Sequence, residues 1–171
     1  EEEKELLAPY AFLSGKKVLY VANVSEESLP SMENALVAKV REYAAAEGNE
    51  VIPICASLEE EVAQLSPEDR KVFLKSLGLN ESGLERLIRS SFKMLGLITY
   101  LTTGEMETRA WTIPQDTAAA VAAGAIHSDI QEGFIRAEVV SYEDMVAAKG
   151  RSAAREKGKV RAEGRHYIVQ D

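Results

Sequence analysis

The stretch Val18-Leu19-Tyr20-Val21-Ala22-Asn23-Val24-Ser25-Glu26 decides how the first half of this chain is organised. It begins as a short apolar run rich in β-branched residues and ends in polar ones, which predicts a buried strand followed by a loop. In open α/β sheets, the loops at the carboxyl ends of parallel strands line the ligand crevice. Asn23 can both donate and accept hydrogen bonds, and the Glu26 carboxylate can accept two donors. We therefore expect binding chemistry at this loop.

Two interpretations of the Asn23-x-x-Glu26 pattern stay open from these residues alone. One is a helix-capping box, which is a common structural motif. The other is base recognition, because P-loop GTPases have Asn-Lys-x-Asp at such a loop, with the Asp accepting both donors of the guanine edge. Here Val24 replaces the Lys and Glu26 replaces the Asp. We expect this loop to hold guanine poorly and adenine better, with backbone groups near Val24 contributing.

A second strand is predicted at residues 51–55, after a helix that Pro30 is expected to start and Gly48 to end. A strand, helix and strand in this order form a crossover unit that brings both strand ends to the same edge. The loop Ala56-Ser57-Leu58 is therefore expected near Asn23, where its backbone N–H groups can face a base.

Three further helices are predicted in this half of the chain, two after the second strand and one before the first strand. Ser66 is an N-cap candidate before a helix that Gly78 ends, and Ser82 with Glu85 forms a capping box before a helix that Gly96 ends. Residues 1–13 show the spacing of the end of an amphipathic helix.

Composition and cysteine content exclude several classes of protein. The 171 residues are 46% hydrophobic and 28% charged, as in an ordinary globular protein. No apolar run is long enough for a membrane span, and the acidic first residues are unlike a signal peptide, so we expect a cytoplasmic protein with no membrane partner. Cys55 is the single cysteine, which excludes an internal disulfide, and we expect a buried structural thiol. No metal-ligand spacing is present, so no zinc site is predicted.

The net charge of −8 is distributed unevenly along the chain. Residues 1–92 have 10 basic and 17 acidic side chains, and residues 93–171 have 10 and 11. Within the second half, residues 149–165 hold seven basic residues against Glu156 and Glu163. Such a segment is either a candidate RNA contact or a solvated face. The candidate contact residues are Lys149, Arg151, Arg155, Lys157, Lys159, Arg161 and Arg165.

From Leu97 onward the hydrophobic period changes from helical to strand-like, and we place a domain boundary just before it, with the second domain at residues 93–171. The patterns predict a hairpin, a helix, a strand, a short helix and a final strand, at residues 97–102 with 108–113, 117–126, 134–140, 141–144 and 166–170. This is the order of a β-grasp domain whose last strand lies in mid-sheet. His127 is interpreted as a capping or packing residue. Trp111 is either a hairpin aromatic or a base-stacking platform.

Seven stretches, taken together and in order, resemble the C-terminal part of the Obg-like ATPases, the YchF subfamily of P-loop NTPases. They are residues 21–26, 54–57, 83–88, 95–100, 108–113, 124–129 and 133–139. The resemblance favours base recognition over the capping box at Asn23.

The resemblance implies an α/β chain of three parts. Residues 1–14 would be the end of a helical arm. Residues 15–92 would be the C-terminal part of a G domain, which is a partial P-loop NTPase segment with a Rossmann-like parallel sheet. Residues 93–171 would be a β-grasp (ubiquitin-like) TGS domain, truncated at its last strand.

The resemblance also implies ATP as the ligand and Mg²⁺ as its metal in the complete protein. The adenine-recognition residues would be Asn23, Val24, Glu26, Ala56, Ser57 and Leu58. This sequence contains no Gly-x-x-x-x-Gly-Lys-[Ser/Thr] motif, so we assign no catalytic residue and no Mg²⁺ ligand within it. The expected function is a segment of a ribosome-associated, translation-linked ATPase whose partner is the large ribosomal subunit or its RNA, and not DNA. The alternative is a non-catalytic RNA- or ribosome-binding module.

Overall fold

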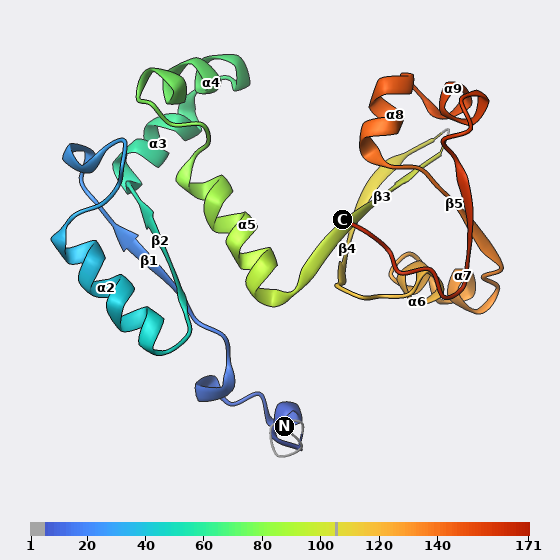
Figure 1. Ribbon diagram of the computed structural model, residues 1–171, viewed down its shortest axis with the longest axis horizontal. Coiled ribbons are helices and arrows are strands. Elements are labelled where there is room, and N and C mark those ends of the chain that lie inside the picture. The colour runs from blue at the N-terminus through green and yellow to red at the C-terminus, as the bar shows by residue number, and fades with distance from the viewer. Residues whose placement is uncertain (1–5, 105) are drawn as a thin grey trace. The chain divides into compact units, whose positions relative to one another are not determined.

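The chain divides into two compact units, Glu1–Leu95 and Gly96–Asp171, in the computed structural model (Figure 1). The structure describes residues 6–104 and 106–171. The division falls after the last helix of the first unit, three residues beyond the boundary expected before residue 93. The helix expected over residues 1–13 lies partly outside the described residues. After Leu7 the chain forms two short 3-10 turns, Ala8–Tyr10 and Leu13–Gly15.

The first unit is built on two parallel strands, β1 (Leu19–Asn23) and β2 (Glu50–Ile54). A 3-10 turn, Glu26–Ser28, and the helix α2, Ala35–Ala46, connect them. The apolar residues of the unit gather in one core, formed by Val24, Met32, Val37, Cys55, Leu58, Val62 and Leu74. The predicted strand-helix-strand unit is therefore present, and its two strands end in register, with Asn23 opposite Ile54.

The start of α2 differs from the prediction that placed it at Pro30. The helix begins at Ala35, because the Asn34 side chain accepts hydrogen bonds from the backbone N–H groups of Leu36 and Val37 at 2.9 and 3.0 Å. Met32 has a φ of +54°, which a right-handed helix cannot include. The strong N-cap at Asn34 was the signal that the sequence analysis overlooked.

Three helices follow β2: α3 (Ala56–Gln64), α4 (Pro67–Ser76) and α5 (Gly83–Leu95). The predicted caps are confirmed. Ser66 Oγ accepts from the Asp69 N–H at 3.2 Å. At α5, Ser82 Oγ accepts from the Glu85 N–H at 3.1 Å while Glu85 accepts from the Ser82 N–H at 2.9 Å, which is a reciprocal capping box.

The edge of β2 that faces away from β1 is blocked. Arg41 Nη1 donates to the Val51 carbonyl at 3.2 Å, and Arg86 Nη2 donates to the Pro53 carbonyl at 2.9 Å. Pro53 itself has no N–H to offer a further strand. A charged and proline-containing edge of this kind opposes pairing, so β2 is built as an edge strand.

The second unit opens with the predicted hairpin, β3 (Leu97–Thr103) and β4 (Thr108–Pro114), which pair antiparallel (Figure 1). The elements after it are α6 (Ala119–Gly124), α7 (Ser128–Glu132), β5 (Arg136–Val139), α8 (Tyr142–Ala148), α9 (Arg151–Glu156) and β6 (Arg161–Gly164). Three of these, α7, α9 and β6, were not predicted. All are six residues or shorter, too short for a clear hydrophobic period.

The segment expected to form the last strand makes only part of one. Ile168 forms an isolated bridge with Ala118, and the Val169 N–H donates to the Thr117 carbonyl at 3.0 Å. Val169 packs against the core of Ile98, Ile113 and Ala122. The described strands form three two-stranded ladders, β1–β2, β3–β4 and β5–β6, so the β-grasp assignment stays a prediction. None of the described helices is both long and apolar enough to cross a membrane.

Candidate functional site

The loops that follow β1 and β2 lie side by side, because the two parallel strands end at the same edge in register. The Val24 N–H continues the ladder by donating to the Ile54 carbonyl at 2.8 Å. The next residues of each loop therefore face each other. The first loop leads into the turn Glu26–Ser28, and the second becomes the first turn of α3.

Asn23 joins the two loops directly. The Ala56 backbone N–H donates to Asn23 Oδ1 at 3.0 Å. Because an N–H can only donate, the oxygen of the amide must face Ala56, and Nδ2 keeps its two N–H donors for another partner. The turn after Asn23 has Ser25 as its N-cap, without a side-chain capping bond. The capping-box interpretation of Asn23-x-x-Glu26 is therefore wrong, since the Asn23 side chain bonds to the neighbouring loop, 33 residues away, and not to the turn that follows it.

Glu26 makes the second bridge between the loops. Ser57 Oγ donates to Glu26 Oε1 at 2.8 Å. The same Ser57 oxygen lies 3.3 Å from Cys55 Sγ. Cys55 has no exposed surface, as expected of a structural thiol, whereas Glu26 and Ser57 are exposed. The Glu26 carboxylate is thus held at the surface by the Ser57 hydroxyl, which in turn contacts the buried thiol of Cys55.

Val24 and Leu58 lie below the surface of the candidate site. Their side chains are 7% and 3% exposed and belong to the core of the first unit. The Val24 N–H already donates to the Ile54 carbonyl. A base that contacts the backbone at Val24 would therefore have to use the Val24 carbonyl oxygen. The exposed groups that can face a ligand belong to Asn23, Glu26, Ala56 and Ser57.

Glu59 fixes the position of α3, and sequence reasoning overlooked it. Its carboxylate accepts from the Gly83 N–H at 2.6 Å and from the Leu84 N–H at 3.2 Å, at the start of α5. A carboxylate at a helix N-terminus is favoured by the unpaired N–H groups and by the helix dipole. Gly83 is required for this approach, because a Cβ there would lie 2.8 Å from Ile54 Cγ2. The only sequence signal was a Gly at the start of a helix, two residues before the Glu of a capping box.

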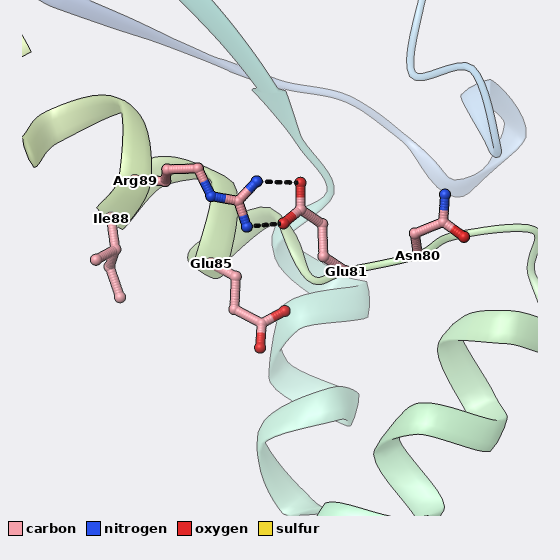
Figure 2. Close-up of a pocket in the computed structure, with 5 residues that line it drawn as sticks. All are labelled: Asn80, Glu81, Glu85, Ile88 and Arg89. Carbon is pink, nitrogen blue, oxygen red and sulfur yellow. Dashed lines mark hydrogen bonds and ion pairs between the residues drawn. The ribbon is translucent and has the colours of Figure 1, made fainter. Parts of the chain in front are cut away.

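A separate surface hollow lies at the N-terminal end of α5, lined by Asn80, Glu81, Glu85, Ile88 and Arg89 (Figure 2). Within it the guanidinium of Arg89 faces the carboxylate of Glu81, with two dashed contacts drawn between them. The two charges neutralise each other. The hollow includes none of the residues of the two loops, and we do not assign the site to it.

The basic segment is largely engaged by acidic residues of its own unit. Arg151 and Arg155 both bond to Glu138, at 2.6 and 2.5 Å. In addition, Lys159 pairs with Asp144 at 3.3 Å, Arg161 with Glu163 at 3.6 Å, and Arg165 donates to the Phe134 carbonyl at 2.5 Å. These pairs are exposed and individually weak, but they lower the positive charge that the sequence alone suggested. Among the described residues, Lys149 and Lys157 form no ion pair.

The side chains of Trp111 and His127 both have structural roles. Trp111 is half-buried, its Nε1 donates to Thr102 Oγ1 at 2.8 Å, and the Arg109 guanidinium covers its ring at 4.4 Å. One face of the indole is therefore occupied, which leaves less of it for base stacking. His127 is the N-cap of α7, since its Nδ1 accepts from the Asp129 N–H at 3.2 Å. Across residues 6–104 and 106–171, no three His, Cys, Asp or Glu side chains are grouped to hold a metal.

Comparison with known proteins shows which family this chain resembles. Residues 97–171 match the YchF-GTPase_C family, described as "Protein of unknown function (DUF933)". The chain is 51% identical to the "Ribosome-binding ATPase YchF" of Bacillus subtilis (strain 168), over all of this chain and 47% of that protein. It is 48% identical to the protein of the same name from Escherichia coli O157:H7, over 99% of this chain and 46% of that one.

The chain belongs to the YchF family. The solved structure of the "Schizosaccharomyces pombe YchF GTPase" matches 97% of this chain and 44% of that one, with a TM-score of 0.83 and 31% identity. This YchF-family chain spans slightly less than half the length of these relatives. The sequence resemblance to the YchF subfamily is thereby confirmed.

Proposed function

We propose that this chain supplies the adenine-recognition edge of a ribosome-binding ATPase, and that ATP is bound and hydrolysed only by the complete protein. The observation that supports the proposal most is the double bridge between the two loops, Asn23 to Ala56 and Glu26 to Ser57. It gathers one amide and one carboxylate at the carboxyl edge of parallel strands, where α/β proteins bind nucleotides.

The groups at this edge match the hydrogen-bonding edge of adenine. Adenine offers an exocyclic amine, which is a donor, beside a ring nitrogen, which is an acceptor. Glu26 can accept from the amine through Oε2, the oxygen that Ser57 leaves available. The Nδ2 group of Asn23 and the backbone N–H of Ser57, at the start of α3, can donate to ring nitrogens.

The names of the relatives differ on the nucleotide. The bacterial relatives are named ATPases, whereas the fission yeast structure is titled a GTPase. We favour ATP for this chain, because Glu26 is one methylene longer than the Asp of guanine-binding loops and Val24 offers no lysine stem to cover the base. Hydrolysis would need a phosphate-binding loop and Mg²⁺ ligands from outside these residues.

Titration of the full-length protein with ATP and with GTP tests this proposal. We expect ATP to bind more tightly, and we expect Asn23→Ala and Glu26→Gln each to weaken ATP binding about tenfold, the effect of one hydrogen bond to a charged or partly buried group. The matched controls are Asn80→Ala and Glu27→Gln, which alter the same residue types outside the double bridge. Tighter binding of GTP than of ATP, or equal losses in the controls, would contradict the proposal.

The ribosome is the proposed partner of the complete protein, which would place it in the cytoplasm. The names of the bacterial relatives, which are ribosome-binding ATPases, support a ribosome contact. Within the basic segment, Lys149 and Lys157 are the better candidates for an RNA contact, because the described structure pairs the other cations, except Arg165, with carboxylates.

Charge reversal separates a specific contact from a solvated face. We expect Lys149→Glu with Lys157→Glu to weaken co-sedimentation of the full-length protein with ribosomes and to flatten its salt dependence. Lys71→Glu with Lys75→Glu makes the same charge change on α4 and is the control. If both double variants behave alike, the basic segment is only a solvated surface.

A further inference from the structure

The hydroxyl of Ser57 stands between a buried thiol and an exposed carboxylate. It lies 2.8 Å from Glu26 Oε1 and 3.3 Å from Cys55 Sγ. A carboxylate oxygen can only accept, so the single proton of Ser57 points to Glu26. The contact with Cys55 must then use the thiol proton, and the direction of donation runs from Cys55 to Ser57 to Glu26. Hydrogen bonds in such a chain polarise and orient one another.

Building on the proposed function of this site, we propose that the Ser57 hydroxyl sets its purine preference by holding Glu26 Oε1 away from the base. Ser57 would be a positioning residue, which acts on the nucleotide through Glu26. Its own position is fixed, because Cys55 is fully buried and Ser57 lies in the first turn of α3. Glu59 anchors α3 in turn to the start of α5.

The Ser57 bond opposes guanine specifically. Guanine presents two neighbouring donors, the ring N–H and the exocyclic amine, which a carboxylate binds best with both oxygens turned toward the base. In this structure one of the two oxygens is directed to α3. Binding guanine with both oxygens would require that the Ser57 bond be broken. Once that bond is lost, both oxygens of the Glu26 carboxylate are free to accept from a base.

Adenine is not opposed in the same way. It offers one donor group on this edge, so a single free carboxylate oxygen satisfies it. The Ser57 bond also restricts the rotamers of Glu26 before the nucleotide arrives, which lowers the entropic cost of ordering that side chain. The Ser57 hydroxyl therefore favours adenine, because it occupies the second carboxylate oxygen of Glu26, which only guanine would use.

The test is the ratio of ATP affinity to GTP affinity in the full-length protein, measured by calorimetry for three variants. In Ser57→Ala the carboxylate is released, and we expect GTP to bind more tightly and ATP somewhat less tightly, because the rotamers of Glu26 are no longer restricted. The ratio should fall about tenfold, the effect of one charge-assisted hydrogen bond. Ser57→Thr keeps the hydroxyl and should keep the ratio. Ser76→Ala is the control, because it removes a serine hydroxyl on α4 that donates to the Phe73 carbonyl, outside the two loops.

The outcomes separate this inference from the proposed function. An unchanged ratio in Ser57→Ala, in a protein that still prefers ATP, overturns the role of Ser57 and leaves the adenine site standing. A wild-type protein without preference for ATP overturns both. A parallel loss of ATP and GTP binding in Ser57→Ala shows that the hydroxyl only supports the loop, and also overturns the inference.

Discussion

Replacing Gly83 by Ala tests whether the contact between α3 and α5 holds the candidate site in place. A Cβ at this position would lie 2.8 Å from Ile54 Cγ2 and 2.9 Å from Glu59 Oε1. Real Cβ atoms do not approach so closely, so Glu59 must withdraw from the two N–H groups that it accepts from.

The expected cost follows from three contributions. Overpacking against Ile54 costs about 1–3 kcal/mol. Weakening the bonds of the Glu59 carboxylate costs about 1.5 kcal/mol. The better helix propensity of Ala returns up to about 1 kcal/mol. The net destabilisation is about 2 kcal/mol, which corresponds to about a 30-fold increase in local opening of α5.

Hydrogen exchange of the amides of α5 in the full-length protein measures this opening locally. We expect their exchange to be about 30-fold faster in Gly83→Ala. We also expect ATP to bind more weakly, because loss of the contact with α5 loosens α3, whose first residues Ala56 and Ser57 belong to the candidate site. Gly15→Ala is the control, since, apart from Gly15 and its two chain neighbours, no heavy atom of residues 6–104 or 106–171 lies within 4 Å of a Cβ at that exposed position. Unchanged exchange in α5 would refute the argument that Glu59 and Gly83 form a tight contact.

Three further predictions concern other contacts of the described residues. The hydrogen bond to Glu47 raises the pKa of Tyr20 to about 12. The stabilisation from this bond is therefore full below the ordinary tyrosine pKa of 10.0 and is lost as the pH rises through about 12. In ultraviolet titration, Glu47→Gln should return the pKa of Tyr20 toward its ordinary value. The bonds from Arg151 and then Arg155 lower the pKa of Glu138, so their stabilisation is full above the ordinary glutamate pKa and is lost as the pH falls. In Glu138→Gln both arginines are released, and RNA binding should strengthen if the basic segment contacts RNA, as measured by fluorescence anisotropy. Finally, Arg86→Ala should destabilise the first unit by about 1–3 kcal/mol in denaturant unfolding, because the Pro53 carbonyl loses its donor.

The predicted fold was most accurate where one residue type settles a local conformation. The capping Ser66 and Ser82 mark the starts of α4 and α5 correctly, because a side-chain cap depends on only a few neighbouring residues. The prediction that Pro30 starts a helix was wrong, because the cap at Asn34 and the positive φ of Met32 move the helix start to Ala35. Short elements such as α9 and β6 were missed because their few residues show no period.

The sequence by itself predicted the two strands and the helix between them, and it nominated Asn23 and Glu26 as the candidate ligand-binding residues. These follow from local hydrophobic patterns and side-chain chemistry. Only the tertiary structure decided what Asn23 and Glu26 bond to, because their partners Ala56 and Ser57 lie 33 and 31 residues away along the chain. It also revealed Glu59, whose partners at the start of α5 are 24 and 25 residues distant. The strand-helix-strand order predicted that the two loops would be neighbours, but which atoms bond over such separations depends on how the strands and helices pack.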